Sequence, residues 1–212
     1  MIQEKDREQI KKMFAGRMQN PVTIINFTQE FECDYCKETR EIAEELATLS
    51  DKISVKTYDF VRDLEIARKF DVDKIPATVI VGERDYHVKY YGVPAGYEFV
   101  SLIDDIIDAS QHVTRLSDST KQKLKSISKP VHIQVFVTPT CPYCPRAVRT
   151  AHQFAMENQL IQADMVEATE FPDLSNKYSV MAVPKIVINE RVEFEGAMPE
   201  QIFLSKVEEA LM

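Results

Sequence analysis

The chain alternates between short, continuous apolar runs and longer segments in which apolar residues recur every three or four positions. A continuous run of about four to eight apolar residues predicts a buried strand, whereas the wider spacing predicts an amphipathic helix. The helical spacing is clearest at residues 97–109 and 199–211. Strands that alternate with helices in this way predict an α/β protein with right-handed crossover connections.

The predicted elements occur in the same order in each half of the chain. The order is a strand, a helix, a strand, a short helix, two strands joined by a tight turn, and a closing helix. In the first half these elements fall at residues 22–27, 36–49, 53–60, 64–70, 78–81, 87–91 and 97–109. In the second half they fall at residues 131–137, 144–158, 162–168, 172–178, 185–188, 192–195 and 199–211. An additional helix precedes each set, at residues 4–14 and 117–127.

Landmark residues indicate that the two halves are copies of one unit. The second cysteine pair lies 108 residues after the first, and a β-branched residue followed by proline repeats at the same offset. The first cysteine of each pair precedes that proline by 43 residues, from Cys33 to Pro76 and from Cys141 to Pro184. A unit of roughly 105 residues has therefore been duplicated.

The length of the chain, 212 residues, suits two domains of about 100 residues each. The junction is expected in residues 111–118, between the first closing helix and the second additional helix. We therefore predict one domain at residues 1–112 with a CDYC site, and a second at residues 113–212 with a CPYC site.

The composition is that of a soluble globular protein, with 44% hydrophobic and 28% charged residues. The formal net charge of -8 argues against nucleic acid or an anionic membrane as the main partner. No apolar segment approaches the ~18 residues that a membrane span requires. The start of the chain is charged and lacks the apolar region of a signal peptide, so we expect a cytoplasmic protein.

The cysteines carry the candidate chemistry, because all four of them occur in two CxxC pairs that open predicted helices. The partial positive charge at a helix N-terminus stabilises a thiolate and lowers the thiol pKa from about 8.5 toward roughly 3.5–7.5. We therefore expect Cys33 and Cys141 to be exposed nucleophiles, and Cys36 and Cys144 to be buried resolving thiols. The nucleophile attacks a substrate disulfide, and the resolving thiol then breaks the mixed disulfide.

Two other uses of the cysteines are disfavoured. The pairs of a four-cysteine zinc site usually lie ~15–20 residues apart, whereas a whole predicted unit separates Cys36 from Cys141. A structural cross-link is also disfavoured, because closing a loop of two residues constrains the unfolded chain very little. We therefore expect no metal and no bound cofactor, only redox-active disulfides.

Residues 138–144, TPTCPYC, resemble a glutaredoxin active-site loop, and each half of the chain resembles a thioredoxin fold. Two such folds in tandem (βαβαββα units, each with an extra N-terminal helix) with both CxxC pairs intact resemble the glutaredoxin-like protein disulfide oxidoreductases of thermophilic prokaryotes. The resemblance implies a thiol–disulfide oxidoreductase that reduces, oxidises or isomerises protein disulfides. It also implies electrons from a thioredoxin-reductase-like flavoprotein and a role in cell redox homeostasis.

The resemblance also assigns a role to the residues around the two prolines. In thioredoxin-like folds, a cis-proline packs beside the dithiol and, with the preceding residue, shapes a backbone site for an extended peptide. The corresponding residues in this chain are Ile75, Pro76, Val183 and Pro184. Inside the CxxC loops, Tyr35 and Tyr143 are expected either to add apolar contact surface or to be exposed without a role.

A matched pair of carboxylates, Asp59 and Glu167, ends the second predicted strand of each half. One interpretation is that these side chains accept the proton of the resolving thiol. The other is that they cap the helix that follows, as short polar side chains commonly do. The sequence leaves both interpretations open.

The charges beside the cysteines predict that the two sites differ. Glu32 and Asp34 flank Cys33, and a nearby negative charge raises the pKa of a thiol. Arg146 and Arg149 follow the second pair in its predicted helix, and cations lower a thiol pKa. We therefore predict that the second site is the stronger oxidant and that electrons flow from the first site to the second.

Three other functions stay open. A glutathione-dependent glutaredoxin is less consistent, because glutaredoxins carry Gly-Gly after the fourth strand, where this chain has Gly92-Val93 and Gly196-Ala197. An electron-transfer domain that resembles the N-terminal region of the peroxiredoxin-reducing flavoprotein would keep only one redox-active CxxC. A non-enzymatic peptide-binding module, similar to a chaperone, would use neither pair.

Overall fold

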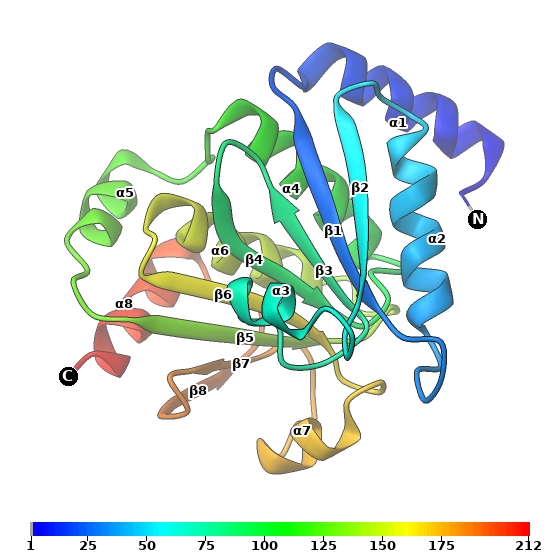
Figure 1. Cartoon of the computed structure of the whole chain (residues 1–212). Coiled ribbons are helices and arrows are strands. Elements are labelled where there is room, and N and C mark those ends of the chain that lie inside the picture. The colour runs from blue at the N-terminus through cyan, green and yellow to red at the C-terminus, as the bar shows by residue number, and fades with distance from the viewer. Residues whose placement is uncertain (1) are drawn as a thin grey trace. The chain divides into compact units, whose positions relative to one another are not determined.

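The computed structural model describes residues 2–212, which form two compact units (Figure 1). The first unit comprises the chain up to Val93 together with Leu102–Val113, and the second comprises Pro94–Ser101 together with Thr114–Met212. The chain changes unit within helix α4 (Glu98–Gln111), because only the first turn of this helix belongs to the second unit.

In the first unit, the strands form a mixed sheet in the order β2-β1-β3-β4. Strand β1 pairs in parallel with β2 and antiparallel with β3, which pairs antiparallel with β4. The strands are β1 (Val22–Thr28), β2 (Ile53–Asp59), β3 (Ala77–Val81) and β4 (Asp85–Tyr91). The helices that lie wholly in this unit are α1 (Glu4–Arg17), α2 (Cys36–Ala47) and α3 (Leu64–Lys69).

The second unit repeats this arrangement, with its strands in the order β6-β5-β7-β8. Strand β5 pairs in parallel with β6 and antiparallel with β7, which pairs antiparallel with β8. The strands are β5 (Val131–Val137), β6 (Ile161–Glu167), β7 (Lys185–Ile188) and β8 (Val192–Glu195). The helices are α5 (Asp118–Lys125), α6 (Cys144–Glu157), α7 (Pro172–Lys177) and α8 (Glu200–Ala210). Across residues 2–212, no helix combines the length and the apolar composition needed to cross a membrane.

The central strand of each unit is buried on both faces, which explains its continuous apolar sequence. Ile24 and Phe27 of β1 are completely buried, as are Ile133, Val135 and Phe136 of β5. The helix after each central strand packs back against it, α2 on β1 and β2, and α6 on β5 and β6. The first turn of each of these helices is therefore held next to the end of a rigid strand.

The predicted fold class and the order of elements are confirmed, and element ends differ from the prediction by at most three residues. The largest difference is in α1, which continues to Arg17 instead of ending at Phe14. The predicted turn between β7 and β8 is present, with Asn189 at φ 50° and Glu190 at φ 55°. Two consecutive residues at positive φ make the mirror-image turn that suits the twist of a hairpin.

Candidate functional site

Each cysteine pair lies between a central strand and the helix that follows it. Cys36 is the first residue of α2, and Cys144 is the first residue of α6. All four cysteines are in disulfides, Cys33–Cys36 and Cys141–Cys144, and the Cα atoms of each pair are 5.5 Å apart. The strand and the helix therefore fix each disulfide at a helix N-terminus.

In the second site, the helix N-terminus contacts the first sulfur directly. The backbone N–H of Cys144 donates to Cys141 Sγ at 3.1 Å. The same sulfur lies 3.7 Å from the carbonyl oxygen of Val183, which precedes the proline. After reduction of the disulfide, a donor in this position stabilises the Cys141 thiolate over the thiol.

The resolving cysteines are the more buried members of the two pairs. Cys36 and Cys144 are buried, whereas Cys33 is partly exposed. Cys141 differs from the expected exposed nucleophile, because it is only 7% exposed. The Val183 carbonyl beside its sulfur accounts for part of this cover. A substrate disulfide therefore has a narrower approach to Cys141 than to Cys33.

Both prolines occupy the positions that the resemblance implies. The Ile75–Pro76 and Val183–Pro184 peptide bonds are cis. Each proline directly precedes the third strand of its unit, β3 or β7. The glycine that follows the fourth strand donates its N–H to the proline carbonyl, at 3.0 Å in the first unit and 2.8 Å in the second. The structure thus brings Val183 to the second disulfide and gives the two prolines the same backbone hydrogen bond.

Exposed apolar side chains accompany both disulfides. Tyr35 and Tyr143, inside the CxxC loops, are exposed. Two further side chains were not expected from the sequence. Phe31, two residues before the first cysteine, is 75% exposed, and Met181, three residues before the second cis-proline, is 89% exposed. A search for large apolar residues within a few positions of the cysteines and prolines would have found both.

Asp59 and Glu167 bind the backbone of the turn that follows each of them. Asp59 Oδ1 accepts hydrogen bonds from the N–H groups of Val61 and Arg62, at 3.0 and 2.8 Å. Glu167 Oε2 accepts one from the N–H of Glu170 at 2.7 Å. These N–H groups belong to the turns that precede α3 and α7, so the carboxylates bind the turn backbone and do not cap the helices. Among the residues that the structure describes, neither carboxylate is hydrogen-bonded to a cysteine, so the proton-acceptor role stays a prediction.

A carboxyl group that was not expected from the sequence lies at the start of α4. Glu98 is 1% exposed, and both of its carboxylate oxygens are buried. Burial raises the pKa of Glu98 from 4.5 to about 7, and the nearby Ser101 hydroxyl offsets part of that rise. The preceding residue anchors it to the second site, because Tyr97 N–H donates to the Pro139 carbonyl at 3.1 Å, two residues before Cys141.

The charged side chains that distinguish the two sites are exposed, except for Arg149, which is partly buried. Glu32 and Asp34 are exposed next to Cys33, and Arg146 is exposed in α6. Both cysteine pairs are oxidised in the structure, so the order of the two potentials stays a prediction. Within residues 2–212, no three His, Cys, Asp or Glu side chains are grouped so that they could hold a metal ion.

Comparisons with known proteins agree with this description. The thioredoxin domain family matches residues 131–209. Among solved structures, a protein disulfide oxidoreductase from Aeropyrum pernix k1 is 34% identical, with a TM-score of 0.92 over 98% of this chain and 93% of that chain. The NTD_N/C domain of alkylhydroperoxide reductase AhpF from Enterococcus faecalis is 23% identical, with a TM-score of 0.90 over 98% of this chain and 100% of that one.

Curated relatives extend well beyond this chain. NADH dehydrogenase from Bacillus subtilis is 27% identical over 83% of this chain, which corresponds to 32% of its own length. The alkyl hydroperoxide reductase AhpF from Pseudomonas aeruginosa is 24% identical over 93% of this chain and 36% of its own length. The chain therefore spans about a third of the length of the curated relatives that it matches.

Two thioredoxin folds, each with a CxxC disulfide at a helix N-terminus, define a thiol–disulfide oxidoreductase. The predicted activity class is therefore confirmed. The identity to the Aeropyrum pernix structure and the nearly complete overlap of the two chains show that this chain belongs to the protein disulfide oxidoreductase family.

We predict that Gly96→Ala destabilises the second unit by more than about 1 kcal/mol. Gly96 has φ 61°, and an added Cβ would lie 2.1 Å from the Pro139 carbonyl oxygen, so the loop before Cys141 would have to move. Gly16→Ala is the control, because nothing lies within 4 Å of its added Cβ and alanine is favoured in a helix. Guanidinium unfolding of both variants measures the difference. Equal stability of the wild type and Gly96→Ala would contradict the prediction.

The raised pKa of Glu98 predicts a pH dependence of stability. Between pH 4.5 and about 7, Glu98 is ionised in the unfolded chain and still protonated in the folded one. Unfolding therefore releases a proton in this window, and the free energy of unfolding falls as the pH rises, by on the order of 3 kcal/mol. Above about pH 7 the contribution is constant.

Glu98→Gln should remove this contribution, so that the variant gains stability relative to the wild type as the pH rises from 4.5 to about 8. Guanidinium unfolding at several pH values measures the difference. The exposed Glu8→Gln on α1 is the control and should follow the wild type. Parallel pH profiles of the wild type and Glu98→Gln would show that Glu98 is not protonated in the folded protein near neutral pH.

Proposed function

We propose that this chain reduces, oxidises or isomerises disulfide bonds of other proteins through both CxxC centres. The arrangement at the second site carries the proposal, because an N–H donor and the Val183 carbonyl both lie beside the Cys141 sulfur. The donor stabilises the attacking thiolate, and the exposed chain before the cis-proline offers backbone groups to an extended substrate. The proposed redox group is the disulfide itself, with no bound cofactor.

In the reducing direction, the Cys141 thiolate attacks one sulfur of the substrate disulfide. The substrate S–S bond breaks, a mixed disulfide forms, and the departing substrate sulfur takes up a proton. Cys144 then loses its proton and attacks Cys141, which releases the second substrate thiol. Two electrons and two protons thus pass from the dithiol to the substrate. Cys33 and Cys36 perform the same steps at the first site.

The proton of Cys144 needs an acceptor that works near neutral pH. We propose Glu98 for this role, since a group with a pKa of about 7 gives and takes protons readily there. Its neighbour Tyr97 is bound to the loop that precedes Cys141, which supports the assignment. The hydrogen bonds of Asp59 and Glu167 to turn N–H groups favour a structural role for those two carboxylates.

Substrate peptides are proposed to bind beside each cis-proline. The backbone at Ile75 and Val183 would pair with the peptide, while the exposed rings of Tyr35 and Tyr143 would contact its apolar side chains. Protein disulfides, rather than glutathione, suit these exposed apolar surfaces.

The electron donor is proposed to be a thioredoxin-reductase-like flavoprotein, and the location the cytoplasm. A second candidate function is an electron-transfer domain in a peroxiredoxin-reducing system, which the likeness to the alkyl hydroperoxide reductase AhpF supports. The two intact CxxC disulfides favour the first candidate, because an electron-transfer domain of that kind would keep one.

Reduction of insulin by dithiothreitol tests the proposal. The wild type should accelerate it, and Cys141→Ser should lose most of the acceleration, because the N–H donor at Cys141 favours the reactive thiolate. Cys33→Ser should lose less. The rate above the uncatalysed background is measured by the precipitation of the insulin chains.

The double variant Cys33→Ser/Cys141→Ser is the matched control and should show the background rate alone. Equal partial losses in the two single variants would mean that the sites act independently. A wild type that does not exceed the background would refute the proposed function.

A further inference from the structure

The loops that carry the two disulfides differ in charge at matched positions, 108 residues apart. The first loop has acidic residues at four of these positions, and the second has neutral or basic ones. The matched pairs are Glu30 with Thr138, Glu32 with Thr140, Asp34 with Pro142, and Glu38 with Arg146. The two loops therefore share one backbone arrangement but differ in the charge of the residues around the cysteines. These surrounding residues of each loop form the rim of its site.

The acidic side chains of the first rim are available to a partner. Glu30, Glu32 and Asp34 are exposed, and among residues 2–212 none of them forms an ion pair. The basic residue of this loop, Lys37 in the first turn of α2, is exposed and pairs with Glu41 at 3.9 Å, so the loop keeps an excess of negative charge.

These charges lie close to the reacting sulfur. Glu32 and Asp34 are the chain neighbours of Cys33, so their Cα atoms are each about 3.8 Å from that of the cysteine. This distance is well inside the Debye length of ~10 Å at 0.1 M salt. A charge next to the disulfide of a docked substrate therefore lies within electrostatic range of these carboxylates.

Exposed aromatic rings alternate with the carboxylates in the first rim, since Phe31 and Tyr35 lie among them. A chain that carries lysine or arginine beside its disulfide can pair with the carboxylates and lay its side-chain stems on the rings. At the second site, Tyr143 and Met181 offer apolar surface, and Arg146 is the exposed charge in the loop or the first turn of α6. That rim favours apolar or acidic flanks.

We propose that the two centres divide their substrates by charge. The first centre exchanges disulfides with basic polypeptides, and the second with neutral or acidic ones. This inference rests on the proposed function, because it specifies the partners of the same two dithiols. At each centre the exchange is balanced as above, since the two electrons and two protons of one dithiol reduce one substrate disulfide. Charged rims of this kind change association rates by about tenfold or more at low salt.

The test uses two short peptides, each with one internal disulfide, that differ only in having lysine or glutamate beside it. Full-length Cys141→Ser/Cys144→Ser, which keeps only the first centre, is reduced, freed of reductant and mixed with each peptide. It should oxidise about tenfold faster with the lysine peptide at low salt. Cys33→Ser/Cys36→Ser, which keeps only the second centre, should react at least as fast with the glutamate peptide as with the lysine peptide. About 1 M sodium chloride should abolish the lysine preference of the first centre.

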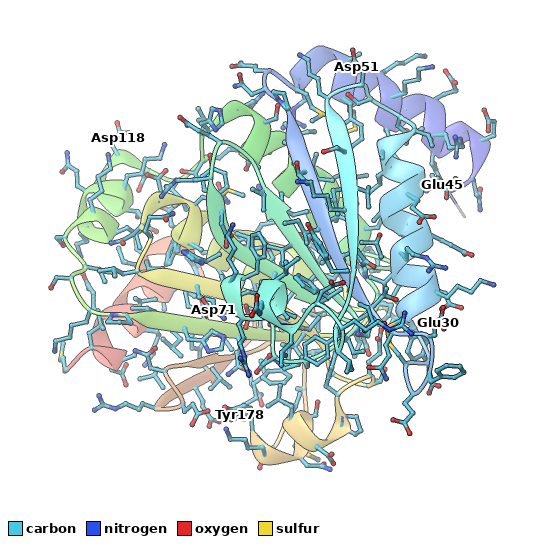
Figure 2. The ribbon with its side chains drawn as sticks, viewed as in Figure 1. Glu30, Glu45, Asp51, Asp71, Asp118 and Tyr178 are labelled. Atoms are coloured by element: carbon cyan, nitrogen blue, oxygen red, sulfur yellow. A yellow bond between two sulfur atoms is a disulfide. The ribbon has the colours of Figure 1, made fainter. Side chains whose placement is uncertain are left out.

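In the Cys141→Ser/Cys144→Ser protein, the combined changes Glu30→Gln, Glu32→Gln and Asp34→Asn neutralise the rim. The ratio of the rate constants with the lysine and the glutamate peptide should then be close to one. The ratio cancels any change in the intrinsic reactivity of Cys33, which both peptides share. The control neutralises three exposed carboxylates elsewhere in the same background, by Asp6→Asn, Glu8→Gln and Asp51→Asn. Asp51 precedes β2 and Glu30 follows the parallel strand β1, so they lie at opposite ends of this unit (Figure 2).

The outcomes separate this inference from the function on which it rests. Oxidation of both peptides at equal rates by the first centre would overturn charge selection and leave the oxidoreductase standing. An equal loss of preference in the control variant would also overturn it, because net charge rather than the rim would then be responsible. Failure of either centre to oxidise with any peptide would refute the proposed function and this inference together.

Discussion

The site depends on backbone N–H groups at the start of a helix that have no partner within the helix. The chain places a sulfur atom where one of these groups points, and the bond from the Cys144 N–H to Cys141 Sγ is the result. For this bond to form, a buried strand must end just before the cysteines and a helix must begin at the second of them. The geometry of the strand–helix junction therefore determines where the disulfide lies, next to the cis-proline loop.

The duplicated unit keeps this backbone arrangement in both halves, whereas the side chains around the two disulfides differ. Both disulfides span 5.5 Å between Cα atoms, and both prolines receive an N–H from the glycine after the fourth strand. Around this frame, Cys33 is partly exposed among carboxylates, whereas Cys141 is nearly covered and its rim carries an arginine. Two centres with the same chemistry can then differ in what reaches them and how fast.

The fold and the reactive cysteines were predictable because their signals are local or periodic. Apolar runs, helical spacing and the 108-residue offset depend on sequence neighbours alone, and they place the helices, strands and both CxxC pairs correctly. The low exposure of Cys141 was not predictable, because it depends in part on Val183, which is 42 residues away in the chain. Glu98 was also missed, since its burial is a tertiary property and the matched position holds Lys206, so the repeat does not mark it.

The different burial of the two nucleophiles has a consequence for protons. Reduction of a disulfide consumes two protons, and water can supply them at Cys33, which is partly exposed. At Cys141 the same cover that restricts the substrate also restricts water, so a proton carrier within the protein becomes useful. Glu98 is the proposed proton carrier, because burial raises its pKa to about 7. In its proposed role, Glu98 would exchange protons readily near neutral pH, where both its protonated and its ionised forms are populated.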